Sequence, residues 1–101
     1  MRFEWDEDKY ESNWRKHRVR LEAAARALLD PFAIEELDRD VASESQWRTV
    51  AEIGEDLLFI VYAAARESHD QSETIRIISA RYASRSERRR YESAKNRALR
   101  T

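Results

Sequence analysis

An almost unbroken apolar segment, Leu57 to Ala64, lies near the middle of the chain. Its residues follow neither a polar alternation nor a helical period. A short run of this kind, bounded by polar residues, is typical of a strand that lies inside a sheet and is buried on both faces. The segment therefore predicts the central strand of a sheet.

Further segments of the chain have the composition of strands. In the stretch that ends at Ile53, Trp47, Thr49 and Ala51 fall on one face and Arg48 and Val50 fall on the other. Short polar stretches separate the strands, and this pattern favours an antiparallel meander. The other predicted strands cover residues 1–5, 32–37, 46–53 and 74–80, and the loops or turns cover 38–45, 54–56 and 67–72.

Three helices complete the pattern. Asp6 is a predicted N-cap for a helix that runs to about His17. A second helix, predicted over Leu21 to Leu29, ends at Asp30-Pro31 because the residue before a proline disfavours the helical conformation. A capping box at residues 84–87 opens an arginine-rich helix over about residues 85–100. The order predicts an α+β fold, a single domain over residues 1–101, with the helices packed on one face of a twisted sheet.

Composition excludes several kinds of site. The chain has no cysteine, so disulfides, thiolate nucleophiles and cysteine-based zinc sites are ruled out. With His17 and His69 as its only histidines, we predict no metal site, and we expect no cofactor. The longest apolar run is too short to cross a bilayer, and the N-terminus does not resemble a signal peptide. We therefore expect a cytoplasmic protein with no membrane partner.

Charge is divided unevenly along the chain. The whole chain has a formal charge of −1, but residues 76–101 contain eight arginines and one lysine against two glutamates. Such a division favours a basic face for a polyanion or for an acidic partner. The alternative is a solvated helix whose charge is neutralised by the acidic half of the chain.

Arginines on predicted strands are the strongest candidates for chemistry. Arg48, Arg76 and Arg81 lie on strands or at their ends, and Tyr91 lies on the following helix. A guanidinium group can bind two phosphate oxygens at once. Cleavage of an RNA backbone needs a base, a cation that stabilises the phosphorane, and an acid. Arginines with a tyrosine and a histidine such as His17 could supply all three without a metal ion.

Each of these residues also has a structural interpretation. Strand arginines often pair with neighbouring carboxylates, here Glu35, Glu36 or Glu52. His17 could interact only with the C-terminal dipole of its helix. Arg76 and Arg81 are five residues apart, so a regular strand would place them on opposite faces, or one of them beyond the strand end.

The chain resembles the BrnT family of bacterial toxins over roughly residues 3 to 92. Its opening matches the family pattern F-x-W-D-x-x-K-x-x-x-N-x-x-K-H, and Asp30-Pro31 matches the D-P step. Residues 76–84 match R-I-I-S-A-R-x-A-[ST], and residues 87–92 match the E-R-x-x-Y-E that follows. Residues 47–50 are similar to the W-x-T-I segment.

This resemblance implies a RelE-like fold and a metal-independent ribonuclease that inhibits translation. It also implies RNA as substrate and a BrnA-like antitoxin whose ribbon-helix-helix domain binds operator DNA, so that this protein reaches DNA only through the complex. The residues carried over as catalytic are Arg81, Tyr91, His17 and Arg76, and those expected to bind RNA are Lys16, Arg48 and Arg88.

Two positions depart from the family pattern. Gln46 replaces the arginine that often precedes the tryptophan, and Arg18 replaces the usual glycine. Arg48 lies on the same strand face as Gln46, displaced by roughly 7 Å, and could substitute for the missing arginine. The departure at Gln46 favours an alternative function, an inactive protein that binds the antitoxin and helps it to repress transcription. A direct nucleic-acid-binding role for the arginine-rich helix is a third hypothesis.

Overall fold

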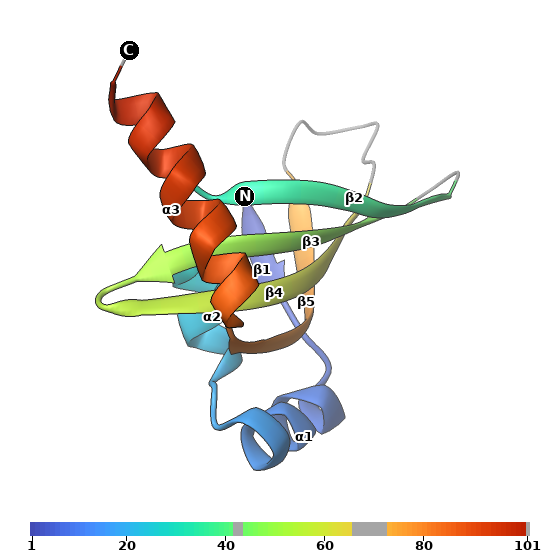
Figure 1. Cartoon of the computed structure of the whole chain (residues 1–101). Coiled ribbons are helices and arrows are strands. Elements are labelled where there is room, and N and C mark those ends of the chain that lie inside the picture. The colour runs from blue at the N-terminus through green and yellow to red at the C-terminus, as the bar shows by residue number, and fades with distance from the viewer. Residues whose placement is uncertain (42–43, 66–72, 101) are drawn as a thin grey trace.

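Five strands form one sheet in the order β1-β5-β4-β3-β2 in the computed structural model (Figure 1). The structure describes residues 1–41, 44–65 and 73–100. The strands are β1 (Arg2–Glu4), β2 (Ile34–Val41), β3 (Glu44–Ile53), β4 (Asp56–Ala65) and β5 (Thr74–Tyr82), and the helices are α1 (Glu7–His17), α2 (Leu21–Ala27) and α3 (Arg85–Leu99). The predicted α+β class and the central position of the apolar strand, β4, are confirmed.

Strands β2 to β5 form the predicted antiparallel meander, and β1 adds a parallel strand at the β5 edge. The predicted loop over residues 38–45 is wrong, because β2 continues to Val41 and β3 begins at Glu44. Polar contacts across this hairpin, such as Gln46 Nε2 to Asp38 at 3.1 Å, hold its acidic residues in strand pairing. The second helix ends at Ala27 rather than at Leu29. The turn predicted over residues 67–72 lies outside the described residues.

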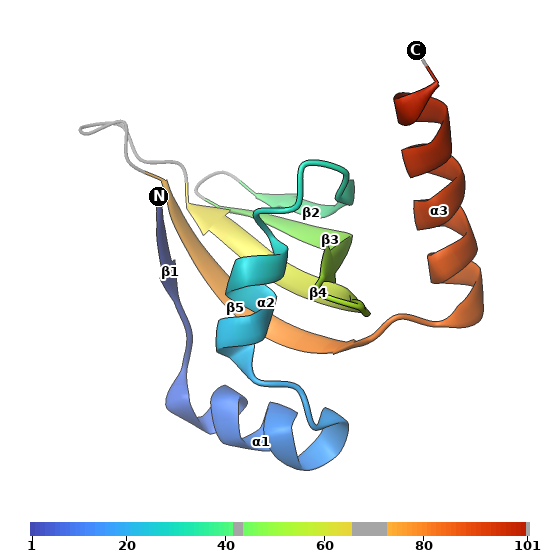
Figure 2. The ribbon, with the colours of Figure 1, turned by 90° about the vertical axis from the view of Figure 1, so that its left-hand side faces the viewer.

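The helices cover both faces of the sheet, so the prediction that they share one face is wrong. Figure 2 shows the sheet between α2 on one side and α3 on the other. The larger core, which includes Leu21, Ile60 and Ile77, lies between the sheet and helices α1 and α2. A smaller core, made of Val50 and Leu57 of the sheet and Tyr91 of α3, lies between the sheet and α3. Because β4 is apolar on both faces, it requires cover on both.

Asn13 joins α1 to the edge of the sheet. It is the buried residue of α1, and its amide nitrogen donates to the carbonyls of Val19 at 2.9 Å and Ala80 at 2.8 Å. Its amide oxygen accepts from the backbone N–H of Ala80 at 2.9 Å. Strand β1 pairs with β5 only as far as Arg76. Further along the same edge, the Asn13 side-chain amide makes the hydrogen bonds to Ala80 that a neighbouring strand would otherwise make.

Arg18 ends α1 in a left-handed backbone conformation, with φ 57° and ψ 33°. This region costs a residue with a Cβ atom about 1–2 kcal/mol, whereas glycine adopts it freely. The guanidinium carbon of Arg18 lies 5.5 Å from the centre of the Trp14 ring, an exposed contact that recovers part of this cost.

We predict that Arg18→Gly raises the free energy of unfolding by roughly 0.5 kcal/mol, because the relieved strain exceeds the lost contact and the added freedom of the unfolded chain. Urea denaturation followed by circular dichroism measures the change. Arg15→Gly is the matched control in the interior of the same helix and should cost about 1 kcal/mol. Equal losses in the two variants would contradict the prediction.

The described part of the chain contains no helix that is both long and apolar enough to span a membrane.

Candidate functional site

A pocket of about 530 Å³ opens on the face of the sheet that α3 covers in part. We call it the sheet pocket. Arg48 of β3, Phe59 of β4 and Arg81 of β5 line it, and α3 closes one side with Glu87 and Arg90. Its charged lining residues are Glu35, Glu36, Arg48, Arg81, Glu87 and Arg90. The Glu35 carboxylate accepts from the Tyr62 hydroxyl of the larger core at 2.9 Å, so the pocket brings together three guanidinium groups and the carboxylates of Glu36 and Glu87.

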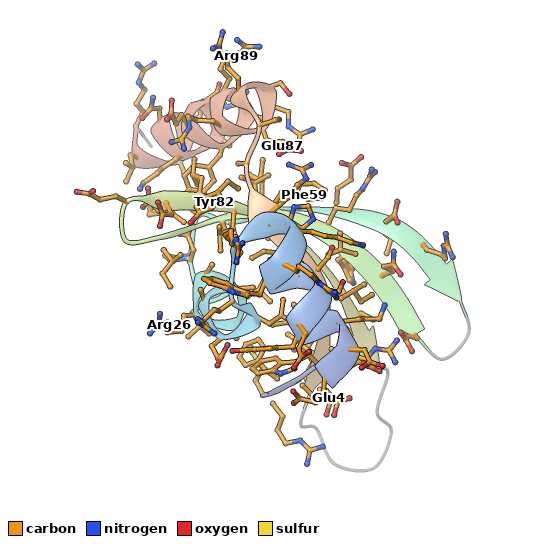
Figure 3. The ribbon with its side chains drawn as sticks, turned by 90° about the horizontal axis from the view of Figure 1, so that it is seen from below. Glu4, Arg26, Phe59, Tyr82, Glu87 and Arg89 are labelled. Carbon is orange, nitrogen blue, oxygen red and sulfur yellow. The ribbon has the colours of Figure 1, made fainter. Side chains whose placement is uncertain are left out.

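Arg81 is held in one orientation at this site. Its Nη1 and Nη2 atoms donate to the two carboxylate oxygens of Glu87, both at 2.9 Å, and Nη1 also donates to the carbonyl of Tyr82 at 3.2 Å. Its guanidinium carbon lies 4.1 Å from the centre of the Phe59 ring. Figure 3 shows Glu87 on α3 and Phe59 on the sheet close to each other where the helix approaches the sheet. The ion pair with Glu87, the hydrogen bond to the Tyr82 carbonyl and the contact with the Phe59 ring together hold the guanidinium group in this orientation.

Arg81 keeps hydrogen-bonding capacity in this arrangement. A guanidinium group has five N–H donors, and the contacts with Glu87 and Tyr82 use three of them. The donors that remain are the Nε–H and one N–H of Nη2. The Arg81 side chain is 38% exposed. An anion in the pocket can therefore bind to this second edge without displacing Glu87.

Glu87 is fixed at the start of α3 by the capping box that the sequence predicts. Its carboxylate accepts from the backbone N–H of Ser84 at 2.8 Å, and the Ser84 hydroxyl accepts from the backbone N–H of Glu87 at 3.2 Å. Partial burial opposes ionisation of Glu87. The hydrogen bonds and charge of Arg81, with the Ser84 N–H, outweigh it and hold the pKa of this carboxyl below its usual value. Glu87 is therefore ionised, and both of its carboxylate oxygens accept hydrogen bonds from Arg81.

Arg48 lies across the pocket in a looser setting. Its Nη2 is 3.5 Å from a carboxylate oxygen of Glu36, and its Nε is 3.4 Å from Asp38. The Nε contact lacks hydrogen-bond geometry, and the side chains of Arg48 and Glu36 are 42% and 58% exposed. Exposed pairs of this kind are weak, so an anion can compete for Arg48.

Arg90 is a pocket residue that the sequence reasoning missed. It is exposed and makes no ion pair with the residues that the structure describes. Its spacing of three residues from Glu87 places both on the side of α3 next to the pocket. The sequence could have indicated Arg90, because it lies three residues after Glu87, the last residue of the predicted capping box.

A bulge in β5 changes the expected relation between Arg76 and Arg81. Val61 pairs with Ser79 and Tyr62 pairs with Ile77, so Ile78 has no partner on β4. This extra residue returns Arg76 and Arg81 to the same face of the sheet, and the prediction of opposite faces is wrong. Arg76 does not line the sheet pocket, however, and pairs with Glu44 of β3.

The remaining predicted site residues lie outside the pocket lining. His17 and Lys16 are exposed at the end of α1, and neither makes a hydrogen bond or ion pair with a described residue. Arg88 lies 3.8 Å from Glu92 on α3. The roles of these three residues in catalysis or RNA binding stay predictions.

Tyr91 anchors α3 to the loop before β2. It is 1% exposed, and its hydroxyl donates to Asp30 at 2.6 Å. Asp30 also accepts from the backbone N–H groups of Phe32 and Glu52, both at 2.9 Å. Burial, reinforced by the charge of Asp30, raises the pKa of Tyr91 well above its usual value. In this arrangement the single hydroxyl proton of Tyr91 is already donated, and proton transfer by Tyr91 stays a prediction.

The Asp30 carboxylate should make stability depend on pH. Partial burial opposes its ionisation, but the hydrogen bonds from Tyr91, Glu52 and Phe32 and the charge of Lys95 lower its pKa. A lowered pKa in the folded state stabilises the protein above the unfolded-state value of about 4, and this contribution is lost as pH falls through the folded-state value.

We therefore predict that Asp30→Asn lowers the melting temperature strongly at pH 7, and that the difference from the wild type shrinks as pH falls below about 4, because the wild type then begins to lose the same contribution. Calorimetry of both proteins between pH 3 and pH 7 measures the difference. Asp56→Asn, at the exposed start of β4, is the control. A constant difference between wild type and Asp30→Asn across this range would contradict the prediction.

Residues 5–87 match a protein-family model described as "Ribonuclease toxin, BrnT, of type II toxin-antitoxin system". The chain belongs to the BrnT family. A comparison with curated proteins found no match. The matched segment contains Arg48, Arg81 and Glu87, whereas Arg90 and nearly all of α3 lie beyond it. Membership places the chain among ribonuclease toxins, a class that acts on RNA and has an antitoxin partner.

Proposed function

We propose that this BrnT-family protein is a cytoplasmic endoribonuclease that cleaves RNA without a metal ion and thereby inhibits translation. The sheet pocket is the proposed active site. The observation that carries the proposal is the arrangement of Arg81, which Glu87 holds in place while its Nε–H and one Nη2–H stay free, in a pocket that Arg48 and Arg90 also line. The edge that carries these two donors matches the geometry of two phosphate oxygens.

The pocket can supply much of what backbone cleavage needs. Arg81 would bind the scissile phosphate and stabilise the negative charge that increases on its oxygens as the 2′-hydroxyl attacks. Arg48 and Arg90 would add positive charge without prior rearrangement of the backbone. Among the pocket carboxylates, Glu36 is exposed and lies beside Arg48, which makes it our candidate for the general base. His17 remains the candidate acid from the sequence, carried by α1.

The proposed partner is a BrnA-like antitoxin with a ribbon-helix-helix domain. In this proposal the antitoxin neutralises the toxin, and the pair binds operator DNA through the antitoxin. The acidic partner surface expected from the sequence would meet the same guanidinium groups as RNA.

Purified protein incubated with labelled RNA tests the proposed activity. Cleavage should proceed in the presence of EDTA and should stop when the antitoxin is added. Induced expression without antitoxin should also arrest growth and degrade cellular RNA. Intact RNA at a saturating concentration of folded protein would overturn the proposal.

One set of contacts favours the alternative, an inactive protein that binds the antitoxin and assists repression. The three arginines that the sequence predicts on strands or at their ends each have a carboxylate partner: Glu36 and Asp38 for Arg48, Glu44 for Arg76, and Glu87 for Arg81. Gln46, at the family's arginine position, donates to Asp38. Tight antitoxin binding by a protein that leaves RNA intact would select this alternative.

A further inference from the structure

Arginines without ion-pair partners gather on one flank of α3. Successive helical residues turn by about 100°, which places Arg89, Arg90 and Arg97 within roughly 100° of one another around the axis. Arg100, just past the end of the helix, continues the same flank. Within the described residues none of the four has an ion-pair partner. We call this set the α3 arginine row: Arg89, Arg90, Arg97 and Arg100.

The opposite flank of α3 has a different character. There Arg88 lies 3.8 Å from Glu92, and Lys95 lies 3.2 Å from Glu52 of β3. Neither Glu87 nor Glu92, the acidic residues of α3, falls on the flank of the arginine row. The helix therefore neutralises its positive charge on one flank and leaves it available on the other.

The α3 arginine row borders a groove of about 430 Å³. Arg89, Arg90 and Arg97 line it with Ala94, and Ile34 of β2 contributes on the sheet side. Ile34 and Arg90 also line the sheet pocket, so the two hollows share a border. Figure 3 shows the Arg89 side chain extending from α3 away from the sheet. From Arg90 to Arg97 the helix rises by roughly 10 Å, which sets the length over which the groove continues beyond the pocket.

We propose that this groove binds the sugar-phosphate backbone of the RNA strand on one side of the cleaved bond. The inference rests on the proposed function, because it assigns the next stretch of the same strand. An RNA strand that leaves the sheet pocket past Arg90 has Arg89 beside it and meets Arg97 roughly 10 Å further along the helix. These guanidinium groups can bind phosphate without first breaking an ion pair within the protein.

The lining of the groove favours RNA over an acidic protein segment. Only Ile34 and Ala94 among its lining residues are apolar, and both are half-buried. Protein interfaces concentrate their affinity in buried aromatic and large apolar anchors, and no aromatic residue is among the described residues that line this groove. Surfaces that bind nucleic acids are more polar and more positively charged.

Binding measurements with an RNA that resists cleavage test the groove. The probe is a single-stranded twelve-nucleotide RNA with 2′-O-methyl groups throughout, compared with a dinucleotide that fits the sheet pocket alone. The double variant Arg89→Ala/Arg97→Ala should bind the longer RNA about tenfold more weakly at 0.1 M salt and bind the dinucleotide as the wild type does. The slope of log affinity against log salt should become shallower by about 1.4, the value for two phosphate contacts on a single strand.

The control double variant is Arg26→Ala/Arg85→Ala, which removes the same charge from exposed arginines that do not line the groove. It should leave the salt slope unchanged. Equal slopes for both variants and the wild type, with RNA cleavage intact in the wild type, would overturn the groove but not the proposed function. Wild-type protein that neither binds nor cleaves RNA would overturn the proposed function. Binding of a twelve-residue polyglutamate peptide as tightly as the RNA would show a protein-binding groove instead.

Discussion

Replacing Arg81 by alanine should lower kcat/KM for RNA cleavage about 100- to 1,000-fold, the usual effect of removing one donor that stabilises an anionic transition state. Arg81 is the pocket arginine whose orientation is fixed by two hydrogen bonds to Glu87 and by the Phe59 ring. The measurement is initial cleavage rate against RNA concentration with purified protein. Expression of the variant without antitoxin should no longer arrest growth.

Arg81→Lys separates charge from geometry in this prediction. Lysine keeps the positive charge, but its compact ammonium group lacks the two flat edges with which a guanidinium group binds Glu87 on one side and a phosphate on the other. We expect a loss of activity nearly as large as that of Arg81→Ala. Arg85→Ala, at the exposed start of α3, is the control and should cleave RNA at the wild-type rate. Wild-type cleavage by both Arg81 variants would remove this residue from the active site.

Replacing Asn13 by alanine should lower the free energy of unfolding by about 3 kcal/mol or more. The change removes three hydrogen bonds, and it leaves the backbone N–H and carbonyl of Ala80 without partners at a buried position. For a domain of this size the expected fall in melting temperature is about 12 °C or more.

Thermal unfolding followed by circular dichroism measures this effect. Asn96→Ala, an exposed asparagine-to-alanine change in α3, is the matched control and should change the free energy of unfolding by less than about 0.5 kcal/mol. Similar melting temperatures for the two variants would show that the edge of β5 does not depend on the Asn13 amide.

Several features could be predicted from local patterns because short-range physics determines them. The apolar run of β4 and the capping box at Ser84 and Glu87 each act within a few residues. Asn13 is a residue whose role such local patterns do not predict. It falls on a polar stripe of α1 in the sequence, and its importance depends on the edge of β5, 67 residues away.

The candidate site shows the same division. The sequence by itself determined the class of fold, the central strand, the basic C-terminal segment and the arginines available to it, because periodicity and charge are properties of neighbouring residues. Tertiary structure decided which of those arginines meet. The bulge at Ile78 places Arg76 on the same face of the sheet as Arg81. Glu87 hydrogen-bonds Arg81 and fixes its orientation. Helix α3 packs on the other face of the sheet from α2, and this places Arg90 in the lining of the pocket. Such outcomes depend on strand register and on packing between segments far apart in the chain, and no local pattern encodes them.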